Sequence, residues 1–155
     1  MVFELDRSYV VGIIDFGNFI NETNIDKYNA PRFPNSFKGK CLIEVYGNEG
    51  NNIPHFYITS INSGKKYEFS CCVCLFDNRF FEHGKNHRDK LHKKDWKILN
   101  DWMSSLNSNN QNITNWKYAV ELWDYANGTD YMNNNDKLDY YNQPDYTTIK
   151  PYKGE

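Results

Sequence analysis

Residues 92–106 read HKKDWKILNDWMSSL, and the apolar side chains of this stretch recur at the spacing of an α-helix. They form one stripe on the predicted helix, made of Trp96, Leu99, Trp102, Met103 and Leu106. The apolar segments that precede this stretch alternate instead with a period of two, as strands do. The change of period separates a strand-rich first part of the chain from a helical second part.

The strand-rich part contains three segments that alternate between apolar and polar residues. Residues 40–60 predict a strand, a turn-rich loop and a second strand, and residues 66–76 (KYEFSCCVCLF) predict a third. Residues 9–20 are β-branched and aromatic with two glycines, which is typical of an opening strand or a bulged hairpin arm. We therefore expect a small antiparallel sheet of three to five strands.

The helical part predicts a second helix after an Asn-rich break. Thr114 is a suitable N-cap and Gly128 a suitable terminator. The residues expected to face inward between them are Trp116, Ala119, Val120 and Trp123. Strands followed by helices predict an α+β fold, in which two C-terminal amphipathic helices cover one face of the sheet.

The length of 155 residues predicts one domain, which we place at residues 1–127, followed by an extended C-terminal arm at residues 128–155. The sequence shows neither a signal peptide nor a run of about 18 apolar residues. We therefore expect a cytoplasmic protein with no membrane contact and, in that reducing compartment, no disulfide framework among its four cysteines. Nothing in the sequence indicates the oligomeric state.

Basic residues gather just before and within the first predicted helix, although the whole chain has a net charge of -2. The cluster consists of Lys85, Arg88, Lys90, Lys93, Lys94 and Lys97. One interpretation is the solvated side of an amphipathic helix and its preceding loop. The other is a partner-binding patch, which would suit an acidic protein, a nucleoprotein complex or the phosphate backbone of a nucleic acid.

Cysteines and histidines offer a second candidate site. Cys72 and Cys74 share a strand face, and His83 or His87 from the following loop would complete four zinc ligands. The cysteine spacing departs from that of zinc knuckles, and small buried cysteines also pack as compact apolar residues. Packing is therefore the first interpretation and metal binding the second, and no cofactor is predicted.

The histidines carry no recognised acid–base motif such as His-Glu-x-x-His, so no catalytic residue is predicted. His55 lies at the start of a predicted strand beside Tyr57. It would belong to a polar face of the sheet or line a shallow groove over the uncovered side.

The order of these features resembles a small bacterial family of uncharacterised proteins. The resemblance rests on the strand start Pro54-His55-Phe56, the hairpin into KKYEF, the helix after LHKKDWK and the closing NWKYAVELW, and it covers residues 40–127. That family is typified by a Pro-His-x-His strand motif and is often encoded near toxin–antitoxin genes and other mobile elements. This chain departs from the motif, because Tyr57 stands at the position of the second histidine. The resemblance implies a small α+β accessory protein of mobile elements.

Two classes of function remain open at this point. The first is a non-enzymatic binding protein, either antitoxin-like or a phage anti-defence protein such as an inhibitor of a CRISPR nuclease. It would engage a protein or nucleoprotein partner through the basic cluster, and nucleic acid also stays open as a partner. The second is a metal-dependent or histidine-dependent enzyme that acts on nucleic acid or a nucleotide.

Overall fold

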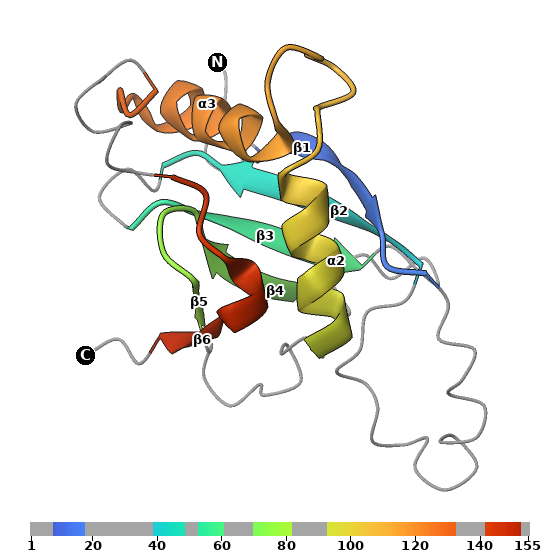
Figure 1. Ribbon diagram of the computed structural model, residues 1–155. Coiled ribbons are helices and arrows are strands. Elements are labelled where there is room, and N and C mark those ends of the chain that lie inside the picture. Colours follow the sequence, from blue (N-terminus) through green and yellow to red (C-terminus); the bar gives the residue numbers. More distant parts are fainter. Residues whose placement is uncertain are drawn as a thin grey trace, which may run out of the picture.

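The computed structural model describes residues 8–17, 39–48, 53–60, 70–81, 93–132 and 142–152 (Figure 1). These residues form one sheet with the strand order β1-β2-β3-β4-β5-β6. The strands are β1 (Ser8–Asp15), β2 (Lys40–Tyr46), β3 (His55–Ser60), β4 (Ser70–Cys74), β5 (Arg79–Phe81) and β6 (Lys150–Tyr152). The first five pair antiparallel with their neighbours, whereas β6 pairs parallel with β5.

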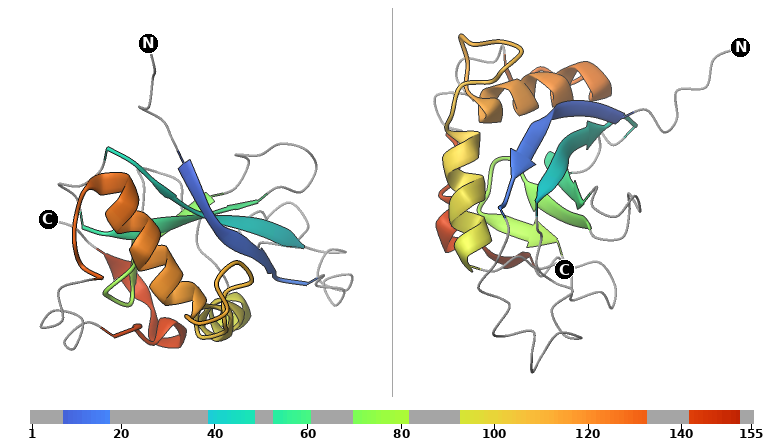
Figure 2. Two further views of the ribbon diagram at one scale, coloured as in Figure 1. Left: turned by 90° about the horizontal axis from the view of Figure 1, so that it is seen from above. Right: turned by 90° about the vertical axis from the view of Figure 1, so that its right-hand side faces the viewer.

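Two α-helices, α2 (Lys93–Met103) and α3 (Asn115–Asn127), lie on one face of this sheet together with the short 3₁₀ helix η4 (Tyr146–Thr148) (Figures 1 and 2). The predicted α+β class, with its antiparallel sheet and two later helices, is confirmed. The sixth strand is an addition that the sequence did not predict.

The core lies between the sheet and the helices. Alternate residues of the central strands join one hydrophobic cluster with the inner faces of α2 and α3, because successive side chains of a strand point to opposite faces. The strand residues of the cluster include Cys41, Ile43, Val45, Phe56, Ile58, Cys71 and Val73. The helices contribute Trp96, Leu99, Met103, Trp116, Ala119, Val120 and Trp123. The inward residues predicted for α3 are therefore confirmed.

Helix α3 is closed at both ends by the residues that the sequence indicated. The Thr114 hydroxyl accepts the backbone N–H of Lys117 at 3.1 Å, as an N-cap does. Gly128 has a φ of 69°, in the left-handed region, and its N–H donates to the Asp124 carbonyl at 2.8 Å. Both predicted ends of this helix are confirmed.

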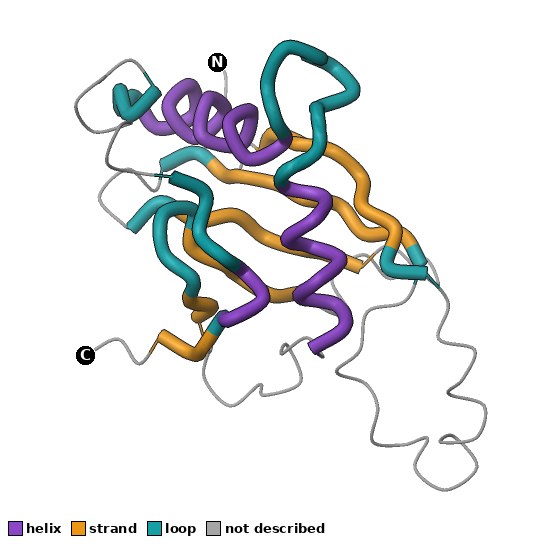
Figure 3. Tube along the Cα trace, in the orientation of Figure 1, coloured by secondary structure: helices purple, strands orange, loops and turns teal. Residues whose placement is uncertain are grey.

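Helix α2 is shorter than the predicted stripe. Trp96, Leu99 and Met103 are buried, but Leu106 lies beyond the end of the helix and is 62% exposed, so its assignment to the stripe was wrong. Just beyond the end of the helix, the Ser105 hydroxyl donates a hydrogen bond to the Asp101 carbonyl. This side-chain bond satisfies a carbonyl group that would otherwise accept from the backbone of a further helical turn. Figure 3 shows the loop that follows, between the two helices.

Asn107 of that loop and Trp102 of α2 both contact the outer strand β1. Strand β1 has a register shift between Val10 and Gly12, and the Asn107 side-chain amide donates to the Val11 carbonyl at 3.1 Å. At Gly12 the Trp102 ring lies so close that a Cβ atom would meet it at 2.8 Å. The bulge, the asparagine and the ring protect part of a sheet edge that would otherwise present unpaired backbone groups.

The described part of the predicted C-terminal arm, residues 142–152, packs into the domain. Tyr146 is fully buried, and its hydroxyl donates to the backbone carbonyls of Cys74 at 2.9 Å and Leu75 at 3.3 Å. Four residues later, the Lys150 N–H donates to the Asn78 carbonyl at 3.1 Å and β6 begins. This segment therefore adds both a core side chain and a strand to the region that we placed at residues 1–127.

Candidate partner-binding site

The basic cluster falls partly within the described residues. Lys85, Arg88 and Lys90 lie outside them. Lys93, Lys94 and Lys97 are exposed on α2, whereas Trp96 of the same helix is buried. The helical period gathers Trp96, Leu99 and Met103 on the buried face, because positions three and four apart share a face.

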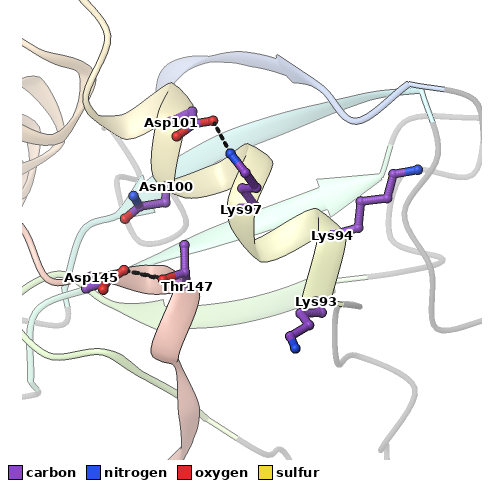
Figure 4. Close-up of a pocket in the computed structure, with 7 residues that line it drawn as sticks. All are labelled: Lys93, Lys94, Lys97, Asn100, Asp101, Asp145 and Thr147. Carbon is purple, nitrogen blue, oxygen red and sulfur yellow. Dashed lines mark hydrogen bonds and ion pairs between the residues drawn. The ribbon is translucent and has the colours of Figure 1, made fainter.

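These three lysines line one wall of a surface groove between α2 and η4 (Figure 4). The groove has a volume of about 800 Å³. Its lining consists of Lys93, Lys94, Lys97, Asn100, Asp101, Asp145 and Thr147. The last two residues come from the C-terminal segment, so the groove joins parts of the chain that are about fifty residues apart.

The wall formed by η4 is held in place by contacts with the core and with α2. Asp145 is the N-cap of η4 and accepts the backbone N–H of Thr147 at 3.0 Å. Tyr146, between these two exposed residues, points into the core and donates its backbone N–H to the Asn100 side chain at 2.9 Å. Gln143 also donates to the Asn100 side chain, at 3.3 Å. Asn100 thus fastens the two walls to each other.

The groove contains charges of both signs. The Lys97 ammonium lies 3.4 Å from the Asp101 carboxylate one turn later, with both side chains about two-thirds exposed. An exposed pair of this kind contributes little to stability. Lys93 and Lys94 project from the first turn of α2 in different directions, whereas Asp145 lies toward the other end of the helix (Figure 4). The surface is therefore polarised along the groove rather than uniformly basic.

All four cysteines are buried and none forms a disulfide bond. Burial, reinforced by the Asp77 carboxylate and opposed by Arg79, raises the pKa of the Cys74 thiol to about 12. Burial also raises the pKa of Cys41 to about 12. Thiols with such pKa values stay protonated at neutral pH, whereas a thiolate is the form that binds metals and attacks electrophiles.

The candidate zinc ligands are only partly placed. Cys72 and Cys74 are buried on β4, while His83 and His87 lie outside the described residues. Among the residues that the structure does describe, no three His, Cys, Asp or Glu side chains converge as a metal site requires. The choice between packing and metal binding for Cys72 and Cys74 therefore stays a prediction.

His55 is 6% exposed and lies among aromatic rings. Its ring centroid is 5.4 Å from that of Tyr57, 5.7 Å from Phe81 and 5.2 Å from Trp123. One ring nitrogen, Nδ1, forms a hydrogen bond of 2.7 Å with the Ile53 carbonyl. The interpretation of His55 as part of an exposed polar face or groove was wrong, because its side chain completes the packing at the end of the sheet.

Four groove residues were missed by sequence reasoning, namely Asn100, Asp101, Asp145 and Thr147. Asp145 followed by Tyr-Thr-Thr is a recognisable capping pattern for a short helix. No local signal, however, tells which part of the body such a helix will pack against. The groove could therefore be identified only from the three-dimensional structure.

No family model matches this chain, and no curated protein or solved structure matches it. Within the described ranges, neither helix combines the length and the apolar character needed to cross a bilayer.

Proposed function

We propose that this protein is a non-enzymatic binding protein that engages a protein or nucleoprotein partner through the groove between α2 and η4. The observation that carries the proposal is the exposure of Lys93, Lys94 and Lys97 on a helix whose opposite face is locked in the core. The resemblance noted from the sequence implies an accessory protein of mobile elements, and within that group we propose an antitoxin-like or anti-defence role, such as inhibition of a CRISPR nuclease.

The groove suits binding because both of its walls are held rigidly. The Asn100 side chain receives the backbone N–H of Tyr146, and the Tyr146 ring is fully buried. A surface that is ordered before the partner arrives loses less conformational entropy on association. The side chains of Lys93, Lys94 and Lys97 are exposed, which places positive charge on this wall of the groove.

The carboxylates of the groove already have structural partners. Asp101 pairs with Lys97, and Asp145 caps η4 through Thr147. Neither is buried, so neither has the low-dielectric surroundings that usually turn a carboxyl into a general acid or base. The groove therefore favours recognition over a chemical step.

The test compares two variants with the same change of net charge. Lys93→Glu/Lys94→Glu reverses charge in the groove, whereas Lys117→Glu/Lys150→Glu reverses two exposed lysines outside it, on α3 and β6. Each protein is immobilised, a host lysate is passed over it with and without nuclease, and the captured partner is then purified and titrated. We expect the groove variant to lose at least tenfold in affinity and the control to bind like the unmodified protein.

Equal binding by both variants would remove the groove from the proposal. Near-stoichiometric zinc in the purified protein, lost in Cys72→Ser/Cys74→Ser, would instead favour the metal-dependent enzyme.

A further inference from the structure

We infer that residues 142–152 dock into the body as an exchangeable ligand, and that the same segment of a second copy of this chain occupies their socket in trans. The socket consists of the body groups that the segment contacts: the carbonyls of Cys74 and Leu75, the side chains of Asn78 and Asn100, and the edge of β5. The inference goes beyond the proposed function, because it concerns which molecule supplies the η4 wall of the groove.

The segment builds its turn from its own residues. The Asp145 side chain accepts the backbone N–H of Thr147 at 3.0 Å, as the cap of a short helix does. The Asp145 carbonyl accepts both the hydroxyl and the backbone N–H of Thr148, at 2.9 and 3.1 Å. Because these bonds lie within four consecutive residues, the shape of η4 does not depend on the body. A segment that is ordered in this way loses less conformational entropy when it docks.

One buried side chain anchors the segment. Of residues 142–150, whose burial the structure gives, only Tyr146 is buried. Its ring meets the Phe56 ring edge-on with the centroids 6.0 Å apart, and its hydroxyl donates to the Leu75 carbonyl at 3.3 Å. That carbonyl also accepts the Trp116 indole N–H at 2.7 Å, so it keeps a partner when the tyrosine leaves. Withdrawal of the segment therefore removes one side chain from the core.

Strand β6 is added at the edge of the sheet. It pairs parallel with β5 and is the last strand in the order of the described sheet, so it can leave without crossing another strand (Figure 1). Asn78, just before β5, grips the segment twice. Its side-chain amide donates to the Thr148 hydroxyl at 2.8 Å, and its carbonyl accepts the Lys150 N–H at 3.1 Å. An extended segment that adds to a sheet edge and fills a pocket with one side chain is a recurring mode of peptide binding.

A second copy of the chain carries the same segment and the same socket. A reciprocal exchange therefore restores in each chain the contacts described above, which is why domain swapping is a low-cost route to dimers. Exchange competes with docking within one chain, so it increases with protein concentration. In the exchanged pair, each groove has its lysine wall from one copy and Asp145 and Thr147 from the other.

The first experiment supplies the segment as a fluorescein-labelled peptide of residues 142–152 and reads its anisotropy. The proteins are the full chain, Tyr146→Phe and Tyr146→Ala, and the control peptide carries Tyr146→Ala. We expect the tyrosine peptide to bind the Tyr146→Ala chain about tenfold more tightly than the unmodified chain, whose own segment competes for the socket. Binding to Tyr146→Phe should lie between these two, and the alanine peptide should bind none of the proteins.

The second experiment tests whether a second copy supplies the segment. Asn78→Cys and Thr148→Cys, made in separate full-length chains, replace two side chains whose polar atoms lie 2.8 Å apart. The two variants are mixed at high and at low concentration and treated with a short bismaleimide. We expect a covalent dimer on a denaturing gel from the concentrated mixture, less from the dilute mixture, and almost none from either variant alone. The natural cysteines are buried and should react little.

The inference is overturned if the tyrosine peptide does not bind folded Tyr146→Ala, or if the alanine peptide binds it equally well. If circular dichroism shows that Tyr146→Ala does not fold, Tyr146→Phe decides, and equal binding of the peptide by Tyr146→Phe and the unmodified chain overturns the docking. Equal yields of covalent dimer from the mixture and from the single variants overturn the exchange between copies.

Discussion

Helices α2 and α3 pack on the same face of the sheet, yet they are used differently. Helix α3 is capped at both ends, and its side chains reach the sheet backbone: the Trp116 indole donates to the Leu75 carbonyl and the Asn127 amide to the Tyr46 carbonyl. Helix α2 buries one apolar stripe and leaves its lysines in a groove. The difference indicates that α3 serves mainly to hold the fold, whereas α2 combines a buried face with the exposed lysines that we propose to bind a partner.

The largest effect is expected at the inner face of α3. Trp116→Ala removes a buried ring and the 2.7 Å hydrogen bond to the Leu75 carbonyl, so we expect a loss of about 3–5 kcal/mol in the free energy of unfolding. Urea denaturation followed by circular dichroism measures it. Tyr125→Ala, on the exposed side of the same helix, is the control and should cost less than about 1 kcal/mol. Comparable losses in the two variants would contradict the role given to α3.

The contact of α2 with the sheet edge is tested next. Gly12→Ala would place a Cβ atom 2.8 Å from the Trp102 ring, so we expect destabilisation by about 1–3 kcal/mol through overpacking. Trp102→Phe in the same chain should recover part of that loss, because the smaller ring leaves room for the methyl group. A double-mutant cycle of unfolding free energies measures the coupling, and strictly additive losses would show that the ring is not the obstacle.

A smaller effect is expected at the wall of the groove. Tyr146→Phe removes the hydrogen bonds from the hydroxyl to the Cys74 and Leu75 carbonyls and should cost about 1–2 kcal/mol. Burial raises the pKa of this phenol well above its ordinary value, so the hydroxyl stays protonated and donates throughout the neutral range. Hydrogen exchange should report the loosening first at the amides of residues 145–150. Uniform loss of protection over the whole chain would instead mean that the segment is not a separate unit.

The cap of α3 should contribute less again. Thr114→Ala removes the acceptor for the Lys117 N–H and should cost about 1 kcal/mol, whereas Thr114→Ser keeps the hydroxyl and should restore most of it. Melting temperatures of the three proteins compare the effects. Equal melting temperatures for the alanine and serine variants would show that the hydroxyl is not the stabilising group.

The smallest effect on stability is expected at the outer face of α2. Lys93→Glu/Lys94→Glu changes exposed side chains only and should alter the free energy of unfolding by less than about 0.5 kcal/mol. A larger loss in urea denaturation would mean that these lysines belong to the fold, and the contrast between the two faces of α2 would disappear.

The sequence predicted those features that local pattern determines. Alternation located the strands, the helical period located α2 and α3, and the residue types at Thr114 and Gly128 located the ends of α3. Strands β5 and β6 were missed because a strand of three residues is too short to show an alternating apolar and polar pattern. Their parallel pairing joins residues about seventy positions apart, and only tertiary packing selects such a partner.

The candidate site divides in the same way. The exposure of Lys93, Lys94 and Lys97 followed from the position of Trp96 in the helical repeat. The position of the opposite wall, with Asp145 and Thr147, depends on where Tyr146 is buried. The sequence around a tyrosine in a polar segment does not predict which part of the core will receive its side chain. Burial of His55 was missed because strand alternation does not reveal that rings from β5 and α3 surround it.

The parallel pairing of β6 with β5 has a consequence for the order in which the protein matures. During translation the lysines of α2 leave the ribosome well before residues 142–152 do, so the growing chain presents these lysines before the η4 wall of the groove has been made. Long-range contacts of this kind also form late in folding. The groove would therefore be complete only after residues 142–152 have been synthesised and have packed against α2 and the sheet.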